Sequence, residues 1–559
     1  MMLLFPIGYG VNDDVQIEWL IFNDDSPWGM CYFIHPLLSF IVKQLSIFFP
    51  SIAWYSWMMY GTVFVSFSII LGVVLRFINQ MQETPDKIKN GLYFVCIGGL
   101  AYFIVDAYLY MQWTQTALAV LLAGLLLMIK SQLLKSQLKK LLWVMGGLFL
   151  FSLGCMIRQD VIYIVAPFIC FYVIDSIVKW MGLKNKNWNK IIYTFLHYLS
   201  IAVLCIVSLV TLTVVKSNIL KSSIEWGDKV EEKIVIQSNI VDYSDISGLA
   251  KNYSISGFSD EEINMMKTNF WFSSYDKTIE KMREYNKIVL DGKPLIHGIQ
   301  IHLLKKMSMI SKWIVPVAFL YIFFIFFTKN KRLLSTTIAL ISILALYLYI
   351  GRVTGRVLYG TYLSAFVFLI ISQKSLMEIA RSTRTIFIYR MSLIATLVIE
   401  TIAGWHIAKV WNIRNAVDTT VDEYEYFVRQ KDNFYVCMDV PSIFPRNPFL
   451  HTEEVLGVER GKLNSQTIVG WMHYTPTYEE VLNQGEHAPG IDLYQKLVTQ
   501  DNFYVVTYKV SDESEFPLTI VLNYISKKMN VPVIAERCQD TESHTIWKLK
   551  QDGSSKVRE

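Results

Sequence analysis

Two adjacent carboxylates stand directly after the first apolar segment of the chain, in the run Asn12-Asp13-Asp14. Neighbouring carboxylates beside a membrane suit a general base that accepts the proton of an acceptor hydroxyl. They equally suit ligation of a divalent cation, Mg²⁺ or Mn²⁺, next to a phosphate. A solvated acidic turn is the alternative for these residues taken alone. Asp13 and Asp14 are therefore our candidate catalytic residues and our candidate metal ligands.

Three arginines at the ends of apolar runs have the chemistry to hold a phosphate. Arg158 lies between two such runs, and Arg352 and Arg356 enclose a short turn. A guanidinium keeps its charge and bonds two phosphate oxygens at once. These three residues are therefore candidates for binding a lipid phosphate or pyrophosphate. An ordinary structural ion pair is the alternative for each of them.

Three further polar residues lie on the same side of the predicted bundle: Asp106, Asp160 and Gln112. Ionisable groups at membrane depth are costly and usually have a defined partner. Gln112 opens the run Gln112-Trp113-Thr114, where capping of a helix is the simpler role for the polar side chains. We keep all three as additional candidates for the site.

The elements that must position these residues are membrane-spanning helices. Hydrophobic residues make up 53% of the 559 positions, charged residues only 18%, and the mean hydropathy is +0.35. We count ten apolar runs, each of them able to cross about 30 Å of hydrocarbon as a helix. Met1 to Gly10 is too short to span and is interpreted as the end of an eleventh span, with an interfacial tail as the alternative. The runs extend from Ile52 to Phe77, Gly91 to Tyr110, Thr114 to Met128, Leu141 to Met156, Val161 to Val178, Ile191 to Val215, Ile310 to Phe327, Leu333 to Ile350, Val357 to Ile371 and Thr385 to His406.

The orientation of the bundle follows from the basic residues of the short loops. Alternate connections together hold 18 Lys and Arg, and the other short connections hold few. Loops rich in Lys and Arg remain in the cytoplasm. We therefore expect a multi-pass protein of the cell membrane, with residues 11–51, 216–306 and everything after about 409 outside the cytoplasm.

The composition changes after the last apolar run. Residues 412–559 contain short β-like runs and a helical stretch near Leu518 to Met529, with 22 acidic residues against 15 basic ones. This pattern predicts a small extracytoplasmic α/β domain, and its acidic charge argues against nucleic acid as a partner. Residues 1–411 then form the membrane domain. In the late outer loop, Ser259 with the acids that follow it predicts the start of a helix.

Several common functional motifs are absent from the sequence. It has no phosphate-binding G-x-x-x-x-G-K-[ST] loop, no dinucleotide-binding G-x-G-x-x-G after a strand and no nucleophile elbow of the G-x-S-x-G type. The seven cysteines show no metal-type spacing, and Cys437 and Cys538 are compatible with either a disulfide or free thiols.

In architecture the chain resembles the GT-C superfamily of membrane glycosyltransferases, which includes protein O-mannosyltransferases and lipid A aminoarabinose transferases. Bacterial members of this kind are similar in having a Ser/Asp-rich helix in the late loop, here Phe258 to Phe272, and an Arg-rich turn, here Arg352 to Arg356. The other features that carry the resemblance are Asn12-Asp13-Asp14 in a long first outer loop, an apolar interfacial helix before Trp54-Tyr55, the span beginning Gln112-Trp113-Thr114, the outer Arg158, a large late outer loop and a soluble C-terminal domain.

The resemblance implies an enzyme that takes a sugar from a polyprenyl-phosphate-linked donor and transfers it to an extracytoplasmic acceptor, commonly with inversion. The acceptor is a cell-envelope glycan, a glycolipid or a protein. Asp13 or Asp14 matches the family's first-loop carboxylate and serves as base or metal ligand. A lipid or polysaccharide translocase is the main alternative, and a non-enzymatic membrane sensor or scaffold is the other. A translocase needs charged groups deep in a central pathway, and the sequence has few of them.

Overall fold

The structure is a computed structural model whose chain forms two compact units. The first, here the membrane unit, comprises Met1–Pro6, Met58–Lys216 and Gly298–Trp411. The second, here the polar unit, comprises Ile7–Trp57, Ser217–His297 and Asn412–Glu559. The structure describes residues 8–9, 12–24, 26–31, 33–81, 85–181, 188–222, 230, 232–236, 258–268, 270, 279–291, 313–324, 332–350, 355–372, 385–415, 426–427, 432–438, 447–452, 465–467, 475–483, 493–509 and 515–552.

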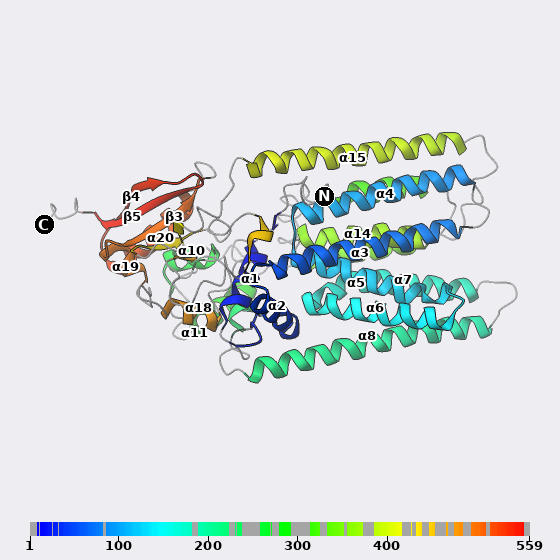
Figure 1. The fold of residues 1–559 in the computed structure, drawn as a ribbon, viewed down its shortest axis with the longest axis horizontal. Coiled ribbons are helices and arrows are strands. Elements are labelled where there is room, and N and C mark those ends of the chain that lie inside the picture. Colours follow the sequence, from blue (N-terminus) through cyan, green and yellow to red (C-terminus); the bar gives the residue numbers. More distant parts are fainter. Residues whose placement is uncertain are drawn as a thin grey trace. The chain divides into compact units, whose positions relative to one another are not determined.

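The membrane unit is a set of long helices that run roughly lengthwise beside one another (Figure 1). Each of the ten predicted apolar runs coincides with a helix, which confirms a polytopic α-helical membrane protein. Among the described residues, seven helices are long and apolar enough to cross a membrane, and three of the predicted spans are shorter apolar helices there. The helices are α3 (Trp54–Asn79), α4 (Asp86–Leu109), α5 (Trp113–Lys130), α6 (Gln137–Ile157), α7 (Ile162–Met181), α8 (Trp188–Ser222), Trp313–Phe324, α13 (Arg332–Ile350), α14 (Gly355–Ile371) and α15 (Thr385–Asn415).

Helix α5 is the most buried of the seven candidate spans, and two glycines let α6 pack closely on it. Of the apolar window of α5, 94% is buried, against 11% for α8. A Cβ atom added to Gly124 would lie 2.5 Å from the carbonyl oxygen of Gly147, and one added to Gly147 would lie 2.6 Å from that of Gly124. Small residues at a helix contact let two backbones approach this closely. The hydrophobic effect does not drive helix association in a membrane, so the dispersion and weak polar contacts of close packing stabilise the pair.

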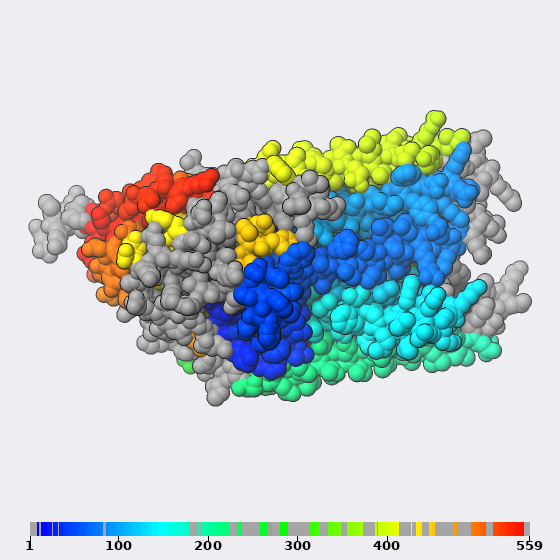
Figure 2. All heavy atoms as spheres, viewed as in Figure 1, coloured from blue at the N-terminus to red at the C-terminus, as the bar shows by residue number. Residues whose placement is uncertain are grey.

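Large apolar side chains cover the outer surface of the membrane unit. Helix α15 is visible along most of its length in the space-filling view (Figure 2). Its Leu397 and Trp405 are 68% and 65% exposed. Contiguous apolar exposure on this scale suits a lipid environment and is costly in water.

The polar unit combines short helices with one mixed sheet. The order of the strands is β2-β1-β3-β5-β4; β1 is parallel to β2 and β3, and β5 is antiparallel to β3 and β4. All five strands come from residues after 412, which confirms the predicted α/β character of this segment. The elements are α1 (Asn12–Asn23), α2 (Pro36–Phe48), α10 (Asp260–Lys267), α11 (Ile279–Asp291), the 3₁₀-helix η8 (Pro448–Leu450), α18 (Pro476–Asn483), α19 (Leu493–Thr499), α20 (Glu515–Met529), β1 (Phe434–Cys437), β2 (Ser465–Thr467), β3 (Phe503–Tyr508), β4 (Val533–Asp540) and β5 (His544–Gln551).

Aromatic pairs stabilise the parallel centre of this sheet. Phe434 stacks on Phe503 with ring centroids 5.1 Å apart, and Tyr435 stacks on Tyr504 at 5.8 Å. The residues of each pair are direct neighbours in the register of β1 and β3. Successive side chains point to opposite faces of a strand, so the two pairs stabilise both faces.

Local signals of the sequence explain where several helices begin and end. Helix α10 starts with the predicted cap: the Ser259 hydroxyl accepts a hydrogen bond from the Glu262 amide at 3.2 Å, and the Glu262 carboxylate accepts one from the Ser259 amide at 2.8 Å. Helix α20 ends at Met529, and the next residue, Asn530, has a φ of 54°, in the left-handed region that Asn tolerates. The chain then turns into β4.

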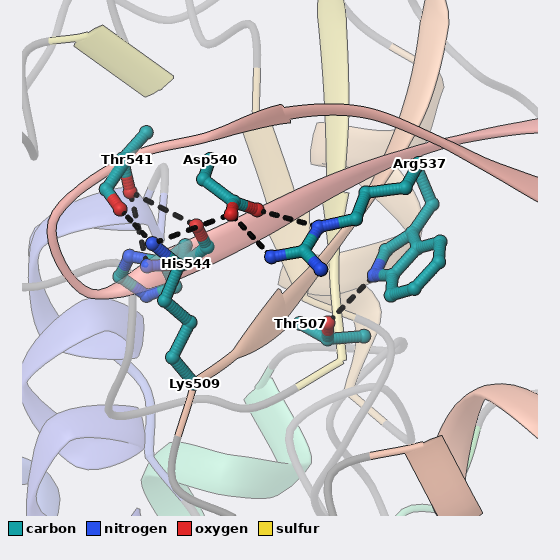
Figure 3. A network of polar contacts seen from close by, with 7 residues as sticks. Thr507, Lys509, Arg537, Asp540, Thr541 and His544 are labelled. Carbon is teal, nitrogen blue, oxygen red and sulfur yellow. Dashed lines mark hydrogen bonds and ion pairs between the residues drawn. The ribbon is translucent and has the colours of Figure 1, made fainter.

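A network of polar contacts fixes the turn between β4 and β5 (Figure 3). Arg537 forms a two-pronged ion pair with Asp540, and Lys509 lies 3.8 Å from the same carboxylate. The hydrogen bond from Arg537 keeps the pKa of Asp540 below its ordinary value. The Thr541 amide donates to the His544 carbonyl at 2.9 Å, and the His544 amide donates to the Thr541 hydroxyl at 3.0 Å. Arg537, Lys509 and Asp540 therefore have a structural role in this turn.

Candidate functional site

Helix α1 brings three carboxylates together in the polar unit. It begins at Asn12, so Asp13 and Asp14 lie in its first turn, where negative charge interacts favourably with the helix dipole. Glu18 follows Asp14 by four residues and therefore lies on the same face of the helix. Asp13 is half-buried, whereas Asp14 and Glu18 are both fully buried.

Asp14 is held by a hydrogen bond to a tyrosine far along the chain. The Tyr55 hydroxyl donates to Asp14 Oδ1 at 2.9 Å, and both side chains are fully buried. Burial of a carboxylate is costly unless donors stabilise it. This bond therefore fixes the start of α1 against the segment that opens α3.

Glu18 is the centre of a second polar cluster. Its Oε2 lies 2.6 Å from His451 Nδ1 and accepts a hydrogen bond from the Tyr9 hydroxyl at 3.2 Å. The hydroxyls of Tyr9 and Ser56 are 2.8 Å apart, and Ser56 donates to the Pro448 carbonyl at 2.7 Å. Within the described residues, Glu18 Oε1 has no hydrogen-bond partner.

Burial dominates the electrostatics of Glu18. It raises the pKa of this carboxyl above the ordinary value of 4.5, while the charge of His451 and the hydrogen bonds from His451, Tyr9 and Ser56 lower it. The net shift is upward. Glu18 therefore takes up a proton at a higher pH than an exposed glutamate does.

The acidic run at Asn23-Asp24 has a structural role. Asp24 accepts hydrogen bonds from the Met30 amide at 2.7 Å and from the Thr477 hydroxyl at 3.2 Å. It thus connects the turn after α1 with α18. Asn and Asp are residues typical of turns.

In the membrane unit, Asp106 joins three helices. It is 1% exposed, accepts a hydrogen bond from Trp313 Nε1 at 2.9 Å, and lies 3.2 Å from His406 Nε2. These residues belong to α4, the helix Trp313–Phe324 and α15. Asp106 has the defined partners that a buried ionisable group in a membrane helix requires.

Arg158 occupies the C-cap of α6 and is held in a fixed orientation. Its guanidinium donates to the Thr114 hydroxyl at 2.7 Å and lies 4.3 Å from the ring centroid of Trp113. Asp160 forms an ion pair with it at 3.7 Å. The structure thus brings Arg158 and Asp160 together.

Gln112 is the N-cap residue of α5. Its carbonyl accepts a hydrogen bond from the Thr116 amide at 3.0 Å, and its side chain makes no capping bond.

The remaining candidates are less defined. Arg356 is half-buried in the first turn of α14, and Arg352 lies outside the described residues. Among the residues that the structure describes, no group of three His, Cys, Asp or Glu side chains is arranged to hold a metal. All seven cysteines are free thiols, Cys437 and Cys538 among them.

Among the residues of these clusters that sequence reasoning missed are Glu18, His451, Trp313 and His406. Glu18 carries a usable signal, because its spacing of four from Asp14 on a helix puts both carboxylates on one face. The other three are long-range partners, separated from Glu18 or Asp106 by 433, 207 and 300 positions. No local pattern identifies such partners.

Fold and composition together define a polytopic α-helical membrane protein with an α/β C-terminal segment. The crystal structure of ArnT from Cupriavidus metallidurans in the apo state is similar to it over 97% of this chain and 93% of that chain, at 10% sequence identity and a TM-score of 0.38. No protein-family model matches the sequence, and no curated protein matches it. A likeness at this TM-score carries no functional argument, so the assignment depends on the residues of this chain.

Proposed function

We propose that this protein is a membrane glycosyltransferase that moves a sugar from a polyprenyl-phosphate-linked donor to an extracytoplasmic acceptor. The observation that carries the proposal is the start of α1, where the half-buried Asp13 stands beside the buried and hydrogen-bonded Asp14. A general base must reach the hydroxyl from which it takes a proton. Asp13 is the more exposed of the two carboxylates, so we assign it as the base. Asp14, which is buried and bonded to Tyr55, then holds Asp13 in place.

The transfer has a simple balance of atoms and electrons. The acceptor hydroxyl gives its proton to the Asp13 carboxylate while its oxygen forms a bond to the anomeric carbon of the sugar. The bond from that carbon to the phosphate oxygen breaks, and the lipid phosphate leaves with the electron pair. Attack from the face opposite the leaving group inverts the anomeric centre.

The donor phosphate is assigned separately, to the membrane unit. Charge grows on a leaving phosphate in the transition state, and a fixed guanidinium stabilises it without having to reorganise. Arg158 has such a fixed orientation, because Thr114 and Trp113 hold it. Arg352 and Arg356 are the other proposed phosphate residues, on the chemistry of their side chains.

The acceptor side follows from the predicted orientation of the chain. We place the polar unit outside the cytoplasm, where cell-envelope glycans, glycolipids and proteins are the available acceptors. Asp13 and Asp14 are also the proposed ligands of a divalent cation. Loss of transfer on chelation, with recovery on addition of Mg²⁺ or Mn²⁺, is the measurement that checks this role.

The test is sugar transfer by purified protein in lipid from radiolabelled polyprenyl-phosphate donors, with a membrane-envelope extract as acceptor. Removal of a general base costs about 100-fold or more in rate, so Asp13→Asn should lose that much activity. Asp14→Asn keeps an oxygen that accepts the Tyr55 hydrogen bond and should lose less. Asp86→Asn, which changes an exposed carboxylate at the start of α4, is the matched control and should retain full activity.

Two results would overturn the proposal. Full transfer by Asp13→Asn and by the Asp13→Asn/Asp14→Asn double variant would remove the carboxylates from the chemistry. Binding of polyprenyl phosphate without turnover of any sugar-loaded donor, unchanged by these substitutions, would favour a translocase.

A further inference from the structure

Two cations meet at one end of the membrane unit. Arg76 lies in the last turn of α3, and Lys130 is the last residue of α5. This is the end of the bundle where the chain connects α3 to α4 and α5 to α6. It is also the end for which the basic loops predict a cytoplasmic location.

Lys130 is a buried ammonium among aromatic rings. It is 5% exposed, donates a hydrogen bond to the Tyr172 hydroxyl at 2.8 Å, and its Nζ lies 4.6 Å from the ring centroid of Phe77 and 5.0 Å from that of Tyr172. Cation–π contacts offset part of the cost of removing a charge from water. One hydroxyl and two rings do not neutralise that charge.

Arg76 stands beside this ammonium and stacks on another ring. It is exposed, and its guanidinium carbon lies 5.5 Å from the ring centroid of Trp143. No ion pair joins Arg76 or Lys130 to a carboxylate of the described residues. Among the described residues, these two positive charges therefore have no carboxylate as an ion-pair partner.

Both cations line one small cavity. Its volume is about 10 Å³, and the lining residues are Val73, Arg76, Phe77, Gln80, Lys130 and Trp143. That volume suits one water-sized group. The lining thus combines two cationic side chains, the amide of Gln80 and apolar side chains, and the cavity has room for one oxygen atom.

We propose that Arg76 and Lys130 bind the phosphate of an anionic lipid headgroup, with one phosphate oxygen in this cavity. The guanidinium fork and the ammonium match a phosphate, and the apolar side chains at the same helix ends suit the lipid chains. Basic clefts between membrane helices at a cytoplasmic face are known to take such headgroups. Cations at helix C-termini also interact with the helix dipole, but this explains neither the cavity nor the convergence of two cations on it. The inference is independent of the glycosyltransferase proposal.

Native mass spectrometry of the full-length protein, released from bilayers of phosphatidylcholine and phosphatidylglycerol, tests this site. A Lys or Arg that contacts an anionic headgroup directly contributes a factor of about five in binding. We expect Arg76→Gln and Lys130→Met each to reduce retained phosphatidylglycerol by about fivefold. Lys139→Gln, an exposed lysine in the first turn of α6, should leave retention unchanged.

The outcomes separate specific lipid binding from general charge attraction and from binding of a free phosphate. Equal retention by wild type and Arg76→Gln would overturn the proposal, and Arg76 is exposed, so this variant should fold even if Lys130→Met does not. An equal loss in Lys139→Gln would show only general charge attraction and would also overturn it. Displacement of the lipid by millimolar inorganic phosphate or glycerol phosphate would keep the phosphate chemistry but overturn the lipid as its source.

Discussion

Glu18 and His451 are 433 positions apart in the chain, yet Glu18 Oε2 and His451 Nδ1 lie 2.6 Å apart in the interior of the polar unit. The pair joins the helix that carries Asp13 and Asp14 to the segment that follows η8. Both side chains are at most 2% exposed. The position of α1, and with it that of the proposed base Asp13, therefore depends on a contact with His451.

Glu18 makes the stability of the polar unit depend on pH. Burial raises the pKa of Glu18 above its unfolded value, so the folded state binds this proton more tightly than the unfolded state does. The stabilisation is fully present below the unfolded pKa and is lost as the pH rises through the folded pKa. We expect the melting temperature of wild type to fall across that window, and that of Glu18→Gln to fall less. A circular-dichroism melting series from pH 4 upwards measures it.

The control for this prediction is the partner residue. Removal of one partner of a buried hydrogen bond leaves the other unsatisfied and costs about 1 to 3 kcal/mol, so His451→Ala should be destabilising. His451→Ala/Glu18→Gln should recover part of that loss. An additive double variant would contradict direct coupling between the two side chains.

The second prediction concerns the fixed orientation of Arg158. Arg158→Lys keeps the charge but loses the planar fork and its stacking on Trp113. A charge-assisted hydrogen bond is worth about 1.5 to 3 kcal/mol, so the donor KM should rise about tenfold or more in a transfer assay. Arg390→Lys, at an exposed position of α15, should behave like wild type. An unchanged KM in Arg158→Lys would remove Arg158 from the donor-phosphate site.

The third prediction compares two adjacent glycines of α6. A Cβ atom on Gly147 meets the Gly124 carbonyl oxygen at 2.6 Å, whereas one on Gly146 meets nothing within 4 Å. Gly147→Ala should therefore separate α5 from α6 and destabilise the bundle by about 1 to 3 kcal/mol. Gly146→Ala should be neutral or slightly stabilising, because alanine is the better helix former. Thermal aggregation of the detergent-solubilised protein compares the two, and equal stability would contradict the close packing.

The fourth prediction tests which side of the membrane holds the polar unit. Of the seven cysteines, only Cys170 and Cys538 are exposed, and Cys170 lies within the apolar span α7. A membrane-impermeant maleimide should therefore label Cys538 in intact cells or spheroplasts. Cys538→Ser should abolish the signal, and detergent lysis should leave the wild-type signal nearly unchanged. Labelling that appears only after lysis would place this unit in the cytoplasm.

The sequence by itself determined the helices of the membrane unit and the α/β character of residues 412–559. Long apolar runs form helices because a backbone in hydrocarbon must satisfy its own hydrogen bonds, and this constraint acts within each segment. The cap at Ser259 and the run Phe503–Tyr508 are local in the same way. The adjacent acids Asp13 and Asp14 could likewise be chosen as candidates from residue type and position.

Only the tertiary structure decided which polar residues become partners. Glu18 was missed beside Asp14, and His451, Trp313 and His406 gave no signal, because each meets its partner across hundreds of residues. The distinction between a half-buried Asp13 and a buried Asp14 also depends on Tyr55, 41 positions away. Burial and long-range hydrogen bonds exist only in the packed chain. Two adjacent aspartates therefore differ in chemistry because different groups pack against them.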